Sequence, residues 1–270
     1  MSAIIEHTED VGGVPIFWRE APWEGTPALY VHGVPDSSDS WVGFLERGGG
    51  LAVDLPGFGR SAKRADLDYS IRGYDRFLER FLAHTGVDRV ALVVHDWGAA
   101  ALAFAQRFPE RVERLVVIDA VPLLAGYRWH RLARVWRTPV AGELFMGATT
   151  KWALRRLSGE GSATPGPMPE AWVDEVWSHF DAGTQRAILK LYRSAPPDVL
   201  AAAGTGLGAI TCPALVLWGE QDPYLPTSFA RAYADALGGA TEVEVVAGAS
   251  HWPWLDRPEL VERIVGFATG

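Results

Sequence analysis

Short apolar runs rich in β-branched residues recur along this 270-residue chain, with helical patterns between several of them. They cover residues 28–32, 50–54, 90–95, 115–119, 214–218 and 242–246. This alternation predicts an α/β fold with a mainly parallel sheet and helices on both of its faces. Several runs end in polar or glycine-rich loops, and ligand sites of open parallel sheets lie at that edge. We therefore expect the reactive side chains to lie in those loops.

The pattern changes between about residues 121 and 208, where helical segments rich in arginine and tryptophan surround a Gly/Pro/Ser stretch at 158–169. We interpret residues 122–208 as an α-helical cap inserted into a core domain formed by residues 1–121 and 209–270. Several of the twelve tryptophans lie between Trp129 and Trp177. Aromatic side chains there could line a pocket.

Composition restricts the partners of the chain. Apolar residues make up 48% of the sequence, and the formal net charge of −8 argues against a nucleic-acid or anionic-membrane surface. Cys212 is the single cysteine, which excludes an intrachain disulfide and favours a small buried thiol. No leader pattern and no apolar run of membrane-span length occurs. These features predict a cytoplasmic protein that acts on a small neutral organic substrate, and they leave the oligomeric state open.

Asp96 occupies the place of a catalytic nucleophile. The string Leu-Val-Val-His-Asp-Trp-Gly-Ala (92–99) predicts a strand, a sharp turn and a helix, which is the pattern of a nucleophile elbow. A carboxylate that attacked an ester would form a high-energy anhydride, whereas attack on an epoxide or carbon–halogen centre forms a stable alkyl ester. The alternative is that Asp96 only caps the helix that begins at Trp97.

Two-step chemistry of this kind also needs a base and an acid that orients the base. His251 follows the last predicted strand, and its near-neutral pKa suits a base that takes a proton from water. Asp222, in Gly-Glu-Gln-Asp-Pro, is the first candidate for the acid, although an aspartate before a proline can simply form a turn. Asp119, at the end of residues 115–119, is the alternative acid.

An oxyanion hole requires backbone N–H groups directed at the ester carbonyl. Trp97 follows the nucleophile and would supply one group, and Val34 in the His-Gly-Val-Pro turn would supply the other. We expect His32 and Asp54 to brace loops rather than to react.

Five motifs together resemble one family. His-Gly-Val-Pro (32–35), Asp-Leu-Pro-Gly-Phe-Gly-Arg-Ser (54–61), Val-His-Asp-Trp-Gly (94–98), Gly-Glu-Gln-Asp-Pro (219–223) and Ser-His-Trp-Pro (250–253) resemble the epoxide hydrolase and haloalkane dehalogenase branch of the α/β-hydrolase superfamily. The resemblance covers both core segments and is weaker in the cap. It implies an eight-stranded core, a helical cap over the site, no cofactor or metal, and the order nucleophile, acid, histidine, which Asp96, Asp222 and His251 reproduce.

An epoxide hydrolase must stabilise the alkoxide that ring opening creates, and cap tyrosines do this in the family. Tyr192, near the end of the cap, resembles one of the two ring-opening tyrosines. Its alternative role is an interfacial aromatic with a solvated hydroxyl. A second tyrosine is not evident, because the spacing of Tyr127 does not fit. We favour an epoxide hydrolase.

A haloalkane dehalogenase is the second hypothesis, because a leaving halide needs only weak N–H donors in a dry pocket. Trp97 matches a halide-holding tryptophan, and Trp136, followed by Trp129, is the candidate for a second donor, whereas Val34 departs from the asparagine or glutamate of known dehalogenases. Trp97 and Ala100 replace the arginines that fluoroacetate dehalogenases use, which disfavours an anionic substrate. A catalytically silent binding protein is the remaining alternative.

Overall fold

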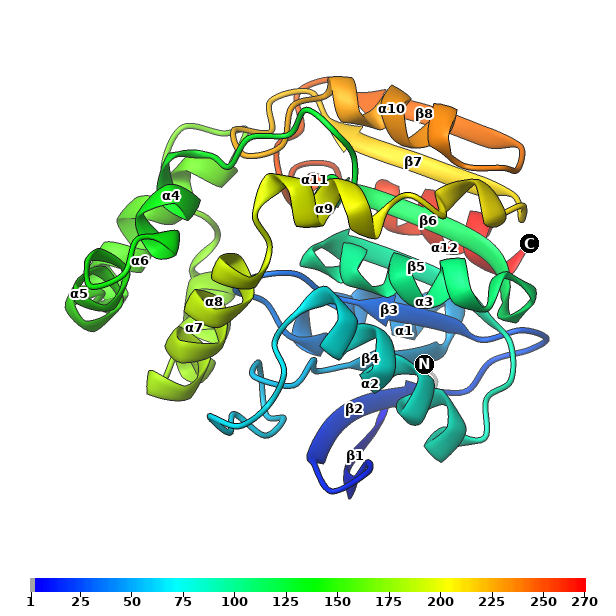
Figure 1. The fold of residues 1–270 in the computed structure, drawn as a ribbon. Helices are drawn as coiled ribbons and strands as arrows, with labels where there is room; N and C mark the ends of the chain where they lie inside the picture. The colour runs from blue at the N-terminus through cyan, green and yellow to red at the C-terminus, as the bar shows by residue number, and fades with distance from the viewer. Residues whose placement is uncertain (1–2) are drawn as a thin grey trace.

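An eight-stranded sheet with the order β1-β2-β4-β3-β5-β6-β7-β8 forms the centre of the computed structural model, which describes residues 3–270 (Figure 1). The strands are β1 (Ile5–Asp10), β2 (Pro15–Ala21), β3 (Ala28–Val31), β4 (Gly50–Val53), β5 (Val90–Asp96), β6 (Val112–Ala120), β7 (Ala214–Gly219) and β8 (Thr241–Val246). Pairing is antiparallel for β1–β2 and β2–β4 and parallel elsewhere. The predicted mainly parallel sheet is confirmed, and its six predicted strands are β3 to β8.

The two N-terminal strands were not among the runs predicted from periodicity. Strand β1 reads Ile-Glu-His-Thr-Glu-Asp and is almost entirely exposed at the sheet edge. An exposed edge strand buries no continuous apolar face, so its sequence lacks the alternation that marks a strand. Only the family resemblance implied the full eight strands.

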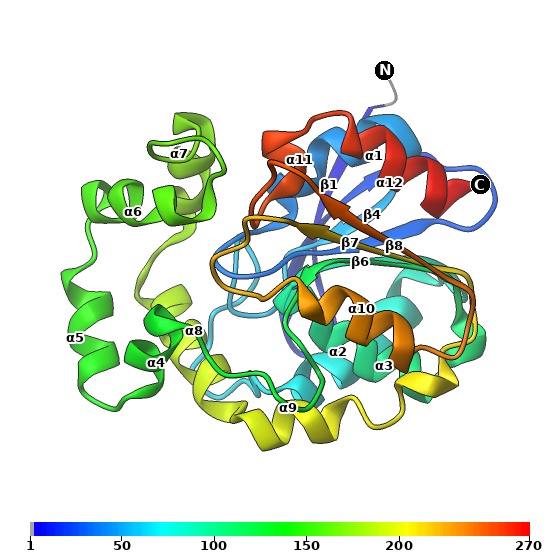
Figure 2. The ribbon, with the colours of Figure 1, turned by 90° about the horizontal axis from the view of Figure 1, so that it is seen from above.

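Helices cover both faces of the sheet (Figure 2). One face carries α2 (Ile71–Thr85), α3 (Ala101–Arg107) and α10 (Ser228–Ala236), and the other carries α1 (Val42–Gly48), α11 (Pro253–Asp256) and α12 (Leu260–Thr269). Strand β5 is buried along its whole length because alternate side chains enter opposite cores. Leu92 and Val94 pack in the core under α2 and α3, and Val93 packs in the core under α1 and α12.

A helical insertion, defined here as residues 121–213, joins β6 to β7. It contains α4 (Arg131–Arg137), α5 (Ala141–Ala148), α6 (Lys151–Ser158), α7 (Glu170–His179), α8 (Ala182–Ser194) and α9 (Pro197–Ala203). Helices α4 to α8 stand beyond one end of the sheet, whereas α9 returns along the core (Figure 1). Gln106 of α3 fixes the segment that follows α9: its side chain donates to the Ala203 carbonyl and accepts the Gly206 N–H. That residues 122–208 form a separate cap domain stays a prediction.

Single-turn 3₁₀ segments occupy several of the connections, at Ser38–Trp41, Trp97–Ala100, Pro109–Arg111, Gly159–Gly161 and Leu207–Ala209. Cys212 is partly buried just before β7, and burial raises the pKa of its thiol to about 11. Within residues 3–270, no helix is both long and apolar enough to cross a membrane.

Candidate active site

Asp96 sits in a strained turn that lifts its side chain off the sheet. It ends β5 with φ 49° and ψ −117°, and the 3₁₀ turn Trp97–Ala100 separates it from α3. A non-glycine residue at positive φ is strained and marks functional turns. Two glycines make room for this turn. A Cβ on Gly98 would lie 2.2 Å from the Val31 carbonyl oxygen, and one on Gly33 would lie 2.4 Å from the Asp96 side chain. Asp96 makes no side-chain capping hydrogen bond to the helix, so the capping interpretation is wrong.

The two oxygens of the Asp96 carboxylate have different neighbours. Oδ1 accepts the Val34 backbone N–H at 2.8 Å, and Oδ2 lies 3.7 Å from His251 Nε2. Burial raises the pKa of Asp96, and this effect is opposed by His251 and by the backbone N–H groups of Val34 and Trp97. Both groups expected to form an oxyanion hole therefore face this carboxylate.

His251 is held by Asp222. Its Nδ1 lies 2.8 Å from Asp222 Oδ2, while Asp222 Oδ1 accepts the backbone N–H groups of Tyr224 and Leu225 at 2.7 and 3.0 Å. These bonds fix the carboxylate within its loop. Burial lowers the pKa of His251, but the charges of Asp222 and Asp96 reverse this effect and the net shift is upward. An imidazole in these surroundings is well suited to take up a proton.

Asp119 lies beside this pair without taking the place of Asp222. Both of its oxygens accept the Gly219 backbone N–H, at 2.9 and 3.2 Å. Burial, followed by the charge of Asp222, raises the pKa of Asp119 well above its ordinary value. Asp119, Asp222 and His251 also come within 4.8 Å of one another, close enough for a metal ion. The His251–Asp222 hydrogen bond and the Gly219 N–H on Asp119 account for this cluster as an acid–histidine pair beside a second buried carboxylate.

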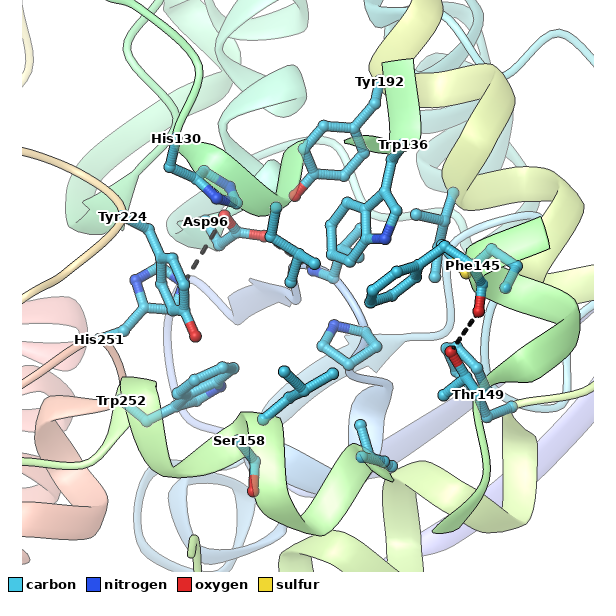
Figure 3. Close-up of a pocket in the computed structure, with 18 of the residues that line it drawn as sticks. Asp96, His130, Trp136, Phe145, Thr149, Ser158, Tyr192, Tyr224, His251 and Trp252 are labelled. Atoms are coloured by element: carbon cyan, nitrogen blue, oxygen red, sulfur yellow. Dashed lines mark hydrogen bonds and ion pairs between the residues drawn. The ribbon is translucent and has the colours of Figure 1, made fainter. Parts of the chain in front are cut away.

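A cavity opens above Asp96 between the core and the helical insertion (Figure 3). Its wall is mostly apolar and aromatic, as ligand pockets usually are. The core contributes Val34, Pro35, Asp96, Tyr224, His251 and Trp252, and the insertion contributes His130, Leu132, Trp136, Phe145, Met146, Thr149, Leu154, Leu157, Ser158, Trp172, Phe180, Ile188 and Tyr192.

Tyr192 and Trp136 both line the cavity, as expected of donors to a leaving group. The Tyr192 hydroxyl points toward Asp96 (Figure 3), and burial, followed by the charge of Asp96, raises its pKa well above the ordinary value. The phenol is therefore protonated at neutral pH. Trp136 Nε1 is buried without a hydrogen-bond partner in residues 3–270.

The other two candidate tryptophans are placed differently. Trp129 donates its Nε1–H to the Ala195 carbonyl at 2.9 Å and does not line the cavity, so the expectation that it serves as a halide donor is wrong. Its N–H satisfies a buried carbonyl, which the sequence did not reveal. Trp97 lies edge-on against Tyr192 with ring centroids 5.1 Å apart, behind the cavity wall.

Sequence reasoning missed two polar side chains of the cavity wall. Tyr224 packs edge-on against His251 with ring centroids 5.1 Å apart, and His130 packs against Tyr224 at 4.9 Å. Burial, followed by the charge of His251, lowers the pKa of His130 to about 4, so this imidazole is neutral at pH 7. Tyr224 could have been predicted to lie near the site because it follows Asp222 by only two positions. Tyr127, in contrast, is buried outside the cavity wall and its hydroxyl donates to the Tyr224 carbonyl at 3.4 Å.

The two residues expected to brace loops do so. His32 Nε2 accepts the Leu55 N–H at 2.9 Å. Asp54 accepts the backbone N–H groups of Ser38 and Arg60 at 2.6 and 2.7 Å. Neither side chain lines the cavity.

Comparisons with known proteins agree with the observed fold. A family model described as alpha/beta hydrolase fold matches residues 26–258. A haloalkane dehalogenase of Mesorhizobium japonicum is 27% identical over 91% of this chain and 85% of its own length, and epoxide hydrolase 2 of Caenorhabditis elegans is 25% identical over 90% and 73%. The crystal structure of the haloalkane dehalogenase DbeA from Bradyrhizobium elkani superposes with a TM-score of 0.83 at 26% identity and covers 98% of both chains.

Proposed function

Because the chain belongs to the α/β-hydrolase fold family, and relatives along most of its length are hydrolases, we propose that it is an epoxide hydrolase that converts epoxides to vicinal diols. One observation carries this proposal. The Tyr192 hydroxyl, protonated at neutral pH, points into the cavity toward the buried carboxylate of Asp96. An epoxide placed between them meets a nucleophile on carbon and a proton donor on oxygen.

In the first step, Asp96 attacks an epoxide carbon. A carbon–oxygen ester bond forms, the ring carbon–oxygen bond breaks, and the new alkoxide takes the Tyr192 hydroxyl proton, which water later replaces. Oδ1 is engaged by Val34 and Oδ2 faces His251, so Oδ2 is the attacking oxygen and Oδ1 becomes the ester carbonyl. His130 and Tyr224 supply further donors around the leaving oxygen.

In the second step, His251 takes a proton from water, and the hydroxide attacks the ester carbonyl carbon of Asp96. The backbone N–H groups of Val34 and Trp97 stabilise the resulting oxyanion. Its collapse breaks the ester bond, the imidazolium returns its proton to the departing diol oxygen, and Asp96 releases the remaining proton of the attacking water to solvent. Asp222 orients His251 and stabilises the imidazolium.

Haloalkane dehalogenation is the second candidate, and Trp136 is the observation that favours it. Its indole N–H lies in the cavity wall without a partner in the described chain, as a halide donor requires. The opposite side offers less, because the Val34 side chain has no donor. The Nε1 atoms of Trp97 and Trp172 are also buried without a partner in the described residues, but only Trp172 lines the cavity.

A panel of epoxides and bromoalkanes, assayed for diol and for bromide, tests the proposal. We expect diol from aryl and alkyl epoxides and only slow bromide release. Bromide release without diol formation would establish the dehalogenase instead. If neither product forms and no alkyl ester of Asp96 appears by mass spectrometry, the binding-protein hypothesis replaces both.

A further inference from the structure

Asp36 is a buried carboxylate next to the cavity that the proposed mechanism does not use. Its side chain is 2% exposed, and its Oδ2 accepts the Trp252 indole N–H at 2.7 Å. Oδ1 has no hydrogen-bond partner in residues 3–270, although the nearby Trp172 indole lowers the pKa of this carboxyl. A buried carboxylate with a single hydrogen bond is costly in an ordinary core. The neighbours of Asp36 therefore bear on why a carboxylate is buried at this place.

Asp36 also lies near His95, which holds the same loop, but the two side chains make no hydrogen bond. Asp36 Oδ2 lies 4.0 Å from His95 Nδ1, and His95 Nε2 lies 2.8 Å from the His251 backbone carbonyl. A carbonyl only accepts, so Nε2 must carry the proton and Nδ1 is left with its lone pair facing Asp36. Burial lowers the pKa of His95 well below its ordinary value, which keeps this ring neutral.

Trp252 connects Asp36 to the proposed base. Trp252 follows His251 in the chain, and the two rings pack edge-on with centroids 4.6 Å apart. Trp252 is held by its bond to Asp36, and the His251 carbonyl is held by His95. His95 in turn directly precedes the nucleophile Asp96. Asp36 thus lies where the loops of the nucleophile and the base converge.

We propose that Asp36 is a positioning residue for His251: it fixes the His251 loop through Trp252, and its negative charge stabilises the imidazolium that forms in the hydrolytic step. This inference rests on the proposed function, because it assigns a role in the second step of that reaction. Alkylation by Asp96 needs no proton transfer to His251, so the proposal predicts an effect on one step only.

The charges around both groups determine the expected pH dependence. The titratable groups that face His251 are Asp222, Asp96, Asp119, Asp36, His95, His130 and Tyr224. Those that face Asp36 are Asp96, His251, His95 and Glu175. Burial raises the pKa of Asp36 to about 7, while Trp252 and His251 oppose the shift. The Asp36 charge in turn contributes to raising the pKa of His251.

Asp36→Asn tests the proposal, since asparagine can still accept the Trp252 N–H but carries no charge. Single-turnover rates of alkylation and of ester hydrolysis are measured against pH. We expect hydrolysis to slow by about tenfold, its acid limb to move to lower pH by about half a unit or more, and alkylation to stay within about twofold. A purely structural role would lower the plateau without moving the limb, and that result would overturn the charge assignment.

Asp39→Asn is the matched control. Asp39 lies in the same loop and pairs with Arg19 and Arg60, away from His251. Its loss should lower the melting temperature without moving the acid limb. An equal shift in both variants would contradict the assignment to Asp36.

An NMR titration of the His251 imidazole in the free protein separates this proposal from the proposed function. The pKa of His251 should fall in Asp36→Asn even if no substrate is found. Should that variant fail to fold, the wild-type carboxyl of Asp36 and the His251 ring are titrated instead, and each curve should report the titration of the other group. Independent curves would overturn the proposal.

Discussion

The core and the helical insertion contribute to the cavity in different ways. The core places Asp96, Asp222 and His251 in loops at the carboxyl ends of β5, β7 and β8, where each side chain is fixed by backbone or side-chain hydrogen bonds. The insertion supplies Tyr192 and Trp136 from helices, together with most of the apolar wall. Under the proposed function, we expect the core to determine the covalent chemistry and the insertion to determine which leaving group and substrate are accepted.

Asp96→Asn should have the largest effect and tests the core side of this comparison. An amide does not attack an epoxide carbon, so we expect no alkyl-enzyme and a loss of turnover of at least about 10³-fold. In the wild type, one turnover in ¹⁸O-water should label the Asp96 carboxylate and leave the new hydroxyl mostly unlabelled. Label that enters the diol in the first turnover would rule out the two-step mechanism.

His251→Gln should separate the two steps. Asp96 can still attack, but no base activates water, so we expect a trapped alkyl-enzyme and turnover reduced by at least about 10²-fold. Mass spectrometry of the intact protein checks this, with unreacted wild type as the mass reference. A variant that shows no adduct on substrates of the wild type would contradict the role given to His251.

The two acids offer a matched pair within the core. Asp222→Asn should lower turnover strongly, because it removes the partner of His251 Nδ1, whereas Asp119→Asn should have a lesser effect. Asp222 raises the pKa of His251, and hydrolysis needs the neutral imidazole. The acid limb of hydrolysis should therefore move to lower pH in Asp222→Asn while the plateau falls. The reverse ranking of the two variants would assign the acid to Asp119.

Tyr192→Phe tests the contribution of the helical insertion to opening of the epoxide. Loss of the hydroxyl should slow alkylation by epoxides by about 10-fold to 10²-fold and leave ester hydrolysis nearly unchanged, because the alkoxide forms only in the first step. Bromoalkanes serve as the control, since a leaving halide needs no proton. Wild-type alkylation rates on every epoxide tried, combined with useful bromide release, would favour the dehalogenase.

The indole donors should produce the smallest effects on an epoxide hydrolase. Trp136→Phe keeps the aromatic wall and removes the N–H that has no partner in the described residues. We expect epoxide turnover to change by no more than about threefold and any bromide release to fall further. Trp97→Phe, measured by the same bromide assay, shows whether the Trp97 indole N–H binds the leaving halide. Stronger damage to epoxide opening than to bromide release would contradict this division of roles.

The core could be predicted further from the sequence than the insertion could. Residues 92–99 identified the elbow because its tight turn demands small neighbours, and β3 to β8 were visible as β-branched runs. In the insertion, Tyr192 was chosen by resemblance, and His130 was missed. Successive residues of a helix turn by about 100°, so one position decides whether a side chain faces a cavity or a neighbouring helix. Trp129 and Trp136 illustrate this, since one donates to a backbone carbonyl and the other lines the cavity.

The sequence by itself determined the mainly parallel sheet and predicted that Asp96 lies in a sharp turn between a strand and a helix, because strand periodicity and the elbow are local properties of a few consecutive residues. Only the tertiary structure decided that Asp222 rather than Asp119 bonds to His251, and that Asp36 reaches the same loop from the far end of the chain. Those choices depend on distances of a few ångströms between segments far apart in sequence. The packing of strands, loops and helices sets such distances, and no local pattern records them.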